Sequence, residues 1–299
     1  IIETQLKDGS GGTSGLLQQI SDMVGVNKQS GNVFKNSSCV VPINDIRGIE
    51  AMAYGKGEKI LRCKLAAIFR LIDLYGWNNS TNTLITARLN QEDEQLLVSP
   101  HGMLFHEITA SSLIKVDMQG SVIEQGTTNF TVNISLFSLL ATVHSARPDL
   151  KCIIHIQTPS VVAISALKHG ILPISQESVV IGEVSTHSYL GGPLDSDEKD
   201  KLARNLGPVN KVLLLSNHGA LCCGETVEEA FFNAKNTVLA SESQLKLLPV
   251  GPDNLILLSD ENKKKIYNAA HSPPESTPRP DQPSILESKV ERKWRVGGI

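Results

Sequence analysis

Two short apolar runs, at residues 153–158 and 213–219, constrain the fold most, because each is typical of a strand buried inside a sheet and each ends in polar residues. Side chains of a strand alternate between its faces, so His155 and Gln157 project from one face of the first run. His218, at the end of the second run, would meet them if the two strands are neighbours. Three protein ligands with one open position define a catalytic zinc site, and zinc binds imidazole readily. The pattern therefore predicts most of a metal site, with glutamine at one of the three ligand positions.

Amphipathic helices alternate with short strands along the rest of the chain. In residues 57–75 the apolar positions recur at spacings of one, three and four, which predicts a helix with one buried face. Thr226 and Glu229 predict a capping box that begins a long helix toward residue 248. Alternation of this kind indicates an α/β domain. The other predicted helices cover residues 136–146, 161–168 and 195–206, and the predicted strands cover residues 84–88, 96–99, 113–117, 152–157, 179–184 and 212–215.

Composition divides the chain into three parts. Residues 1–38 are rich in glycine and polar side chains, so we expect a flexible segment with a short helix over 16–23. Residues 39–270 carry the alternating pattern and form the predicted folded domain. Residues 271–299 are proline-rich and cannot bury enough apolar surface to order themselves, which predicts a disordered linker. Because the sequence begins at Ile1 and not at methionine, we expect it to be a fragment.

Charge and hydropathy exclude two broad classes of protein. The chain has 28 Lys and Arg against 31 Asp and Glu, and a formal net charge of -3 provides no basic field for nucleic acid. No apolar run is long enough for a membrane-spanning helix. The five cysteines lack disulfide spacing, and Cys63 and Cys152 lie within apolar patterns, which favours buried thiols in a reducing, cytoplasmic compartment.

Several motifs in the right order resemble the class II aldolase/adducin family. Arg147-Pro148-Asp149, His155-x-Gln157 and Asn217-His218-Gly219 resemble the family as a whole. Further stretches resemble its adducin head, at residues 42–48, 56–67, 170–175, 224–231 and 293–295. The resemblance implies a three-layer α/β/α fold on a central, largely antiparallel sheet, which assembles as tetramers in the aldolase members.

The resemblance also shows which enzyme residues this sequence has replaced. In the enzymes a strand His-x-His and a later histidine hold zinc, and a glutamate acts as the base. The first and last histidines correspond to His155 and His218, the second strand histidine to Gln157, and the glutamate to Leu136. A glutamine carbonyl is a weak zinc ligand compared with imidazole, and leucine can neither ligate nor accept a proton. We therefore interpret these four positions as a vestigial metal site with no catalytic residue, no bound metal and no cofactor.

The other candidate positions show weaker signs of a binding or catalytic role. The phosphate-cradling Gly-Asn of the enzymes corresponds to Thr83 and Leu84, so phosphate binding looks lost as well. Cys222 and Cys223 are predicted to lie beyond a strand end without a basic neighbour, which argues against a nucleophile there. The remaining histidines have no paired spacing and are interpreted as surface or helix-end residues; they are His101, His106, His144, His169, His187 and His271.

Family resemblance implies a non-catalytic, oligomerising head of an adducin-like membrane-skeleton protein. The expected partners are actin filaments and spectrin at the cytoplasmic face of the plasma membrane, with barbed-end capping by the full-length chain and calmodulin binding through a neck and tail absent from this sequence. Two alternatives stay open: a divalent-metal-dependent aldolase or lyase with a rebuilt site, and a pseudoenzyme that senses a small molecule. Ser272-Pro273 and Thr277-Pro278 are compatible with a kinase or partner site, although their composition favours a solvated linker.

Overall fold

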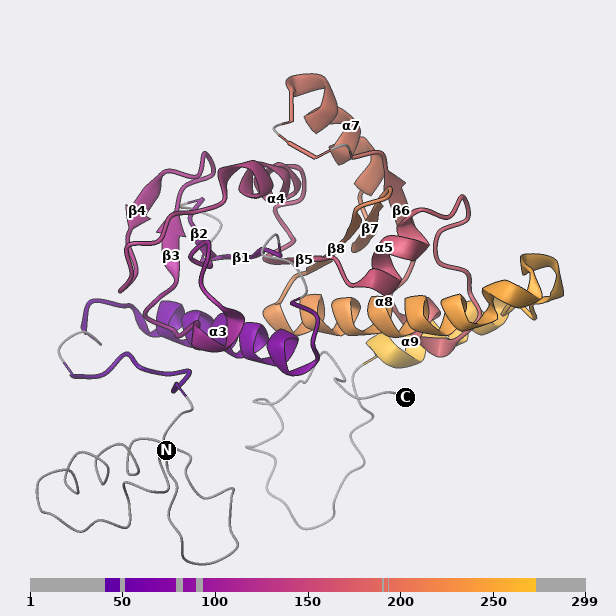
Figure 1. Ribbon diagram of the computed structural model, residues 1–299, viewed down its shortest axis with the longest axis horizontal. Helices are drawn as coiled ribbons and strands as arrows, with labels where there is room; N and C mark the ends of the chain where they lie inside the picture. The colour runs from indigo at the N-terminus through magenta and orange to yellow at the C-terminus, as the bar shows by residue number, and fades with distance from the viewer. Residues whose placement is uncertain are drawn as a thin grey trace, which may run out of the picture. The chain divides into compact units, whose positions relative to one another are not determined.

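The computed structural model describes residues 41–48, 52–78, 83–89, 94–189, 191–192 and 194–272. The chain divides into two units, residues 1–41 and 42–299, and apart from Val41 the described residues belong to the second (Figure 1). The predicted helix over 16–23 and all but the first two residues of the predicted linker over 271–299 lie outside the described residues. The division at residues 38 and 270 therefore stays a prediction.

An eight-stranded sheet forms the centre of the second unit, in the order β4-β3-β2-β1-β5-β8-β7-β6. Among these strands β6 and β7 pair in parallel and the other neighbours pair antiparallel. The sheet is thus largely antiparallel, as predicted. Its strands are β1 (Ile85–Arg88), β2 (Leu96–Val98), β3 (Ile114–Val116), β4 (Val122–Glu124), β5 (Cys152–Ile156), β6 (Val184–His187), β7 (Val212–Leu215) and β8 (Gly219–Gly224).

Helices cover both faces of this sheet, which confirms the predicted three-layer α/β/α architecture (Figure 1). One core lies between the sheet and α3 (Lys56–Leu74), α5 (Pro159–Ser165), α6 (Gln176–Val180), α8 (Val227–Leu247) and α9 (Asp260–His271). A second core lies between the opposite face and α4 (Ile134–Ala146) and α7 (Ser196–Leu206). Short 3-10 turns occupy η3 (Phe105–Glu107), η4 (Leu248–Val250) and η5 (Pro252–Asn254). Within the described residues no helix combines the length and apolar character needed to cross a membrane.

Three predicted features of the secondary structure are wrong. Residues 179–184 do not form a strand, because the Ser175 hydroxyl accepts from the Ser178 N–H and begins α6, and β6 starts only at Val184. Cys222 and Cys223 lie inside β8 and not beyond a strand end. The capping box at α8 is half formed: Thr226 Oγ1 accepts from the Glu229 N–H at 3.1 Å. The Glu229 carboxylate instead accepts from the N–H of residue 225 at 2.7 Å.

A group of four charges, of which Arg62 is buried and the other three are partly buried, ties α3 to β3 and β4. Arg62 has no exposed surface and donates to Glu58 Oε1 at 2.9 Å and to Glu124 Oε1 at 3.0 Å. Lys115 of β3 donates to the other oxygen of each carboxylate, at 2.9 Å in both cases. Arg62 also donates to the Leu113 carbonyl at 2.7 Å. The four charges sum to zero and each has an opposite partner, which is the condition for burying them.

Candidate functional site

The structure brings His155, Gln157 and His218 together. The two predicted strands that carry them, β5 and β7, are not neighbours, because β8 lies between them. β5 pairs with β8, and β8 pairs with β7, so the turn between β7 and β8 lies at the end of β5. The rings of His155 and His218 stack with centroids 5.1 Å apart and planes inclined by 25°. His155 has no exposed surface. Gln157 Nε2 donates to the His218 carbonyl at 3.0 Å and lies 3.3 Å from His218 Nε2.

The turn that carries His218 is tight. Leu215 pairs with Gly219, so three residues close the hairpin, and Asn217 adopts a left-handed backbone with φ of 57°. Gly219 has φ of 147°, and a Cβ there would lie 2.4 Å from the Ile156 carbonyl oxygen. Backbone geometry therefore explains Gly219, where no other residue type fits this approach of β8 to β5, and favours asparagine at residue 217.

Tyr189 closes the other side of the His218 ring. Its ring meets the His218 ring edge-on, with centroids 4.8 Å apart, and its hydroxyl reaches the Gly192 carbonyl at 3.5 Å. Burial lowers the pKa of His218 below its usual value, so the imidazole is neutral at physiological pH. The rings of His155, His218 and Tyr189 and the Gln157 amide together form a clamp between β5, the β7–β8 turn and the loop after β6.

This clamp does not fit a catalytic zinc ion. A catalytic zinc ion takes three protein ligands, with imidazole nitrogens about 2.0–2.1 Å away, and His155 and His218 supply two imidazoles. The Gln157 amide N–H is used on the His218 carbonyl. Its Oε1 is buried without a hydrogen-bond partner among the described residues, which leaves one weak, neutral oxygen donor. No described group of three or more His, Cys, Asp or Glu side chains could hold a metal.

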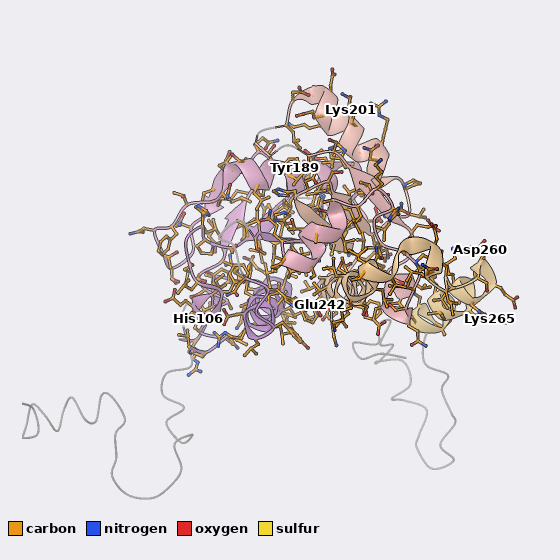
Figure 2. The ribbon with its side chains drawn as sticks, turned by 45° about the vertical axis from the view of Figure 1, so that its right-hand side comes forward. His106, Tyr189, Lys201, Glu242, Asp260 and Lys265 are labelled. Atoms are coloured by element: carbon orange, nitrogen blue, oxygen red, sulfur yellow. The ribbon has the colours of Figure 1, made fainter. Side chains whose placement is uncertain are left out.

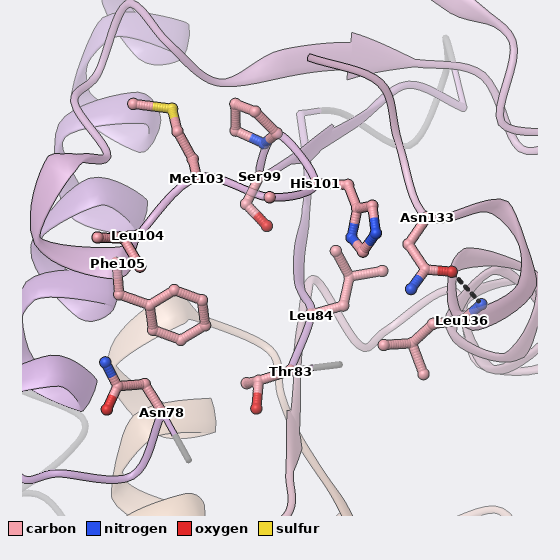
Figure 3. A pocket seen from close by; sticks show the side chains of 12 residues that line it. Asn78, Thr83, Leu84, Ser99, His101, Met103, Leu104, Phe105, Asn133 and Leu136 are labelled. Atoms are coloured by element: carbon pink, nitrogen blue, oxygen red, sulfur yellow. Dashed lines mark hydrogen bonds between the residues drawn. The ribbon is translucent and has the colours of Figure 1, made fainter. Parts of the chain in front are cut away.

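The other three predicted positions line a small cavity beside the clamp. Leu136, Thr83 and Leu84 border a space of about 70 Å³, and Figure 3 shows Leu84 and Leu136 close together below His101. The main chain joins this cavity to the clamp, because the His155 N–H donates to the Leu84 carbonyl at 3.0 Å. Leu84 and Leu136 belong to the apolar core, and the space has room for about two water molecules.

The Arg147-Pro148-Asp149 motif has a structural role, which is to hold the end of α4 in place. Arg147 donates to both oxygens of Asp149, at 2.8 and 2.6 Å, and to the carbonyls of Gly207 and Asn210 at 3.0 and 3.1 Å. The hydrogen bonds from the guanidinium lower the pKa of Asp149. The motif thereby fixes the end of α4 to the segment that follows α7. Sequence reasoning recognised the motif and missed this role.

His144 lies in the last turn of α4, a helix end as one of the two predicted alternatives had it, but it is not a surface residue. It is fully buried near the end of α4, where Nε2 lies 2.9 Å from Thr86 Oγ1 and Nδ1 lies 3.1 Å from the Leu150 carbonyl. Burial and the nearby Arg88 charge lower the pKa of His144 to about 3. His187, which is also buried, bonds to Asn205 through Nδ1 at 2.9 Å.

Cys222 and Cys223 are fully buried in β8, and burial raises the pKa of Cys222 to about 12 and that of Cys223 as well. Both thiols are therefore protonated at physiological pH. Since the thiolate is the nucleophilic form, neither is activated for catalysis.

Comparison with known proteins agrees with this fold. A family model described as "Class II Aldolase and Adducin N-terminal domain" matches residues 63–245. The crystal structure of an aldolase II superfamily protein from Pseudomonas syringae superposes with a TM-score of 0.70 at 34% identity, over 77% of this chain and 91% of that one. L-fuculose 1-phosphate aldolase from Glaciozyma antarctica PI12 gives a TM-score of 0.64 at 24% identity, over 73% and 85% of the two chains, and supports the fold alone. The domain is therefore of the class II aldolase type.

Curated relatives narrow the class further. Protein hu-li tai shao of Drosophila melanogaster is 54% identical over 98% of this chain, and alpha-adducin of Rattus norvegicus is 44% identical over 99%. Gamma-adducin of Homo sapiens is 41% identical over 100% of the chain. The chain spans only 27%, 41% and 42% of the lengths of these three proteins. It belongs to the class II aldolase and adducin N-terminal domain family, and its similarity to adducins confirms the resemblance drawn from its motifs.

Proposed function

We propose that this chain is the non-catalytic, oligomerising head of an adducin-like membrane-skeleton protein. The full-length protein binds actin filaments, promotes spectrin–actin association at the inner face of the plasma membrane and caps barbed ends, and its tail binds calmodulin. Similarity to hu-li tai shao and the adducins supports the family-level part of this proposal. The observation that carries the loss of catalysis is the clamp, in which Gln157 bonds to the His218 carbonyl.

Aldol chemistry requires two parts that these residues do not supply. A metal must polarise the substrate carbonyl, and a base must accept a proton. His155 and His218 provide two imidazoles, and Gln157, which bonds to the His218 carbonyl, stands where the third ligand would be needed. Leu136 stands in the position of the base and packs in the apolar core. A small-molecule sensor at the same place is also disfavoured, because about 70 Å³ is far below the roughly 300–1,000 Å³ of ligand pockets.

Co-sedimentation with spectrin and actin filaments tests this function. We expect the full-length protein to pellet with filaments and to increase the amount of spectrin that pellets. The 299-residue chain is the matched comparison, and we expect it to self-associate but to pellet weakly, since it spans less than half of its adducin relatives. The Gln157→Ala variant of the full-length protein should pellet like the wild type, because the clamp is internal. If the full-length protein fails to pellet with actin and spectrin, the proposed function is wrong.

A further inference from the structure

A groove of about 380 Å³ lies on the opposite side of the sheet from the clamp, between α6, the start of β6 and α9. Its volume falls within the range of small-molecule sites, roughly 300–1,000 Å³. Apolar side chains of Ile171, Val184 and Val209 line it. The Tyr267 ring also lines the groove and packs against Gly182, where an added Cβ would come within 3.1 Å of the ring. The groove therefore offers a preformed apolar surface.

Cationic side chains stand along one edge of this groove. Lys263 and Lys264 line it from α9, one turn before Tyr267 and Asn268, so the i,i+4 spacing places each lysine next to a lining residue. Lys263 pairs with Asp260 at 2.6 Å, but the Asp260 side chain is 88% exposed and such surface pairs contribute little. An incoming anion can therefore replace that carboxylate at a small cost in free energy.

The other charges of the groove act differently. Lys211 forms an ion pair with Glu229, which is fully buried, and another with Glu225 at 3.1 Å. These carboxylates neutralise its charge within the protein. Glu183 also lines the groove and opposes an anion near it. The cations available to an incoming anion are thus Lys263 and Lys264 at the α9 edge, and the apolar surface lies beside them.

We propose that this groove binds an amphipathic phosphate monoester. Its phosphate pairs with Lys263 and Lys264, and its apolar body lies against Val184, Val209 and Tyr267. Charge-assisted hydrogen bonds from two ammonium groups favour a dianionic phosphate over a neutral headgroup. This site is separate from the clamp and from the small cavity, so it does not depend on the proposed function.

Isothermal titration calorimetry with n-octyl phosphate tests the site. We expect saturable binding of one molecule per chain, and an increase in Kd of about tenfold or more in the double variant Lys263→Gln/Lys264→Gln, because two charged contacts are lost. Lys265→Gln is the matched control: Lys265 follows directly in α9 but does not line the groove, and Figure 2 shows it pointing outward. Its Kd should stay within about twofold of the wild type. Glu183→Gln should tighten binding, since it removes the opposing charge.

Matched headgroups and vesicles complete the test. n-Octyl trimethylammonium and n-octanol should bind at least about tenfold more weakly than the phosphate. Pelleting with phosphatidylcholine vesicles that contain phosphatidic acid, lost in the double variant, would identify a membrane lipid as the source. Binding of octyl phosphate without pelleting would identify a free molecule, and either result supports the proposal. Absence of saturable binding, equal effects of the double variant and Lys265→Gln, or equal affinity for octanol would overturn it.

Discussion

Arg62→Met should destabilise the domain by about 3 kcal/mol, the low end of the loss expected when a buried partner is removed from an ionic network, because the remaining charges are partly exposed. Methionine keeps the apolar stem of the side chain, so the change isolates the guanidinium. Without it, Glu58 and Glu124 retain only Lys115, and the Leu113 carbonyl loses its 2.7 Å hydrogen bond. Urea denaturation followed by circular dichroism measures the loss as a fall in the transition midpoint.

Lys64→Met on the same helix is the control for this prediction. Lys64 pairs with Glu228 at 2.7 Å, but the two side chains are 48% and 43% exposed, so we expect a change below about 1 kcal/mol. Two substitutions that each remove one positive charge from α3 should therefore differ severalfold in effect. Equal, small effects would show that the Arg62 network does not stabilise the junction of α3 with β3 and β4.

Acidification should destabilise the domain through His144, beginning well above the pH at which carboxylates protonate. Burial and Arg88 hold the folded-state pKa at about 3, below the usual 6.5. A histidine with a lowered folded-state pKa contributes its full stability above pH 6.5, and that contribution is lost as the pH falls toward 3. Between pH 6.5 and pH 5 the loss amounts to about 2 kcal/mol. His187, His218 and His271 have lowered pKa values and add to it in the same direction.

His144→Gln separates this histidine from the others. Glutamine can still bond to Thr86 and Leu150, and we expect a cost of about 1–3 kcal/mol at pH 7 but a flatter stability curve between pH 6.5 and 5. The exposed His169→Gln variant should keep the wild-type slope. Urea midpoints measured across this pH range give both slopes. An unchanged slope in His144→Gln would contradict the assignment.

The apolar pattern predicted most of the architecture, and its failures have local physical causes. The α3 helix and the β5 strand follow directly from the period of their apolar residues. β8 was missed because its sequence begins and ends in glycine, which usually marks a turn; here Gly224 is required because a Cβ would lie 2.4 Å from the Ala230 nitrogen. The strand predicted over 179–184 is wrong because the Ser175 cap begins a helix, α6, and the first residues of this short apolar run belong to that helix.

The sequence identified the residues of the candidate site, but it did not predict the contacts among them. Strand alternation placed His155 and Gln157 on one face, and the turn brought His218 to them. Sequence could not give the packing of the two imidazole rings or the bond from Gln157 to the His218 carbonyl, because both depend on the β7–β8 turn and on Tyr189. The Arg62 network was missed although Glu58 and Arg62 have the i,i+4 spacing of a helical ion pair, since its other members come from distant strands.

The most direct test of the vestigial site is zinc titration by calorimetry, on the 299-residue chain first stripped with a chelator. Gln157→His serves as the matched variant, because it supplies a third imidazole and frees the His218 carbonyl. We expect this variant to bind zinc more tightly than the wild type. For the wild-type chain we expect no saturable binding with sub-micromolar Kd, and no change on His155→Ala. One zinc per chain bound with sub-micromolar Kd, and lost on His155→Ala, would contradict the account.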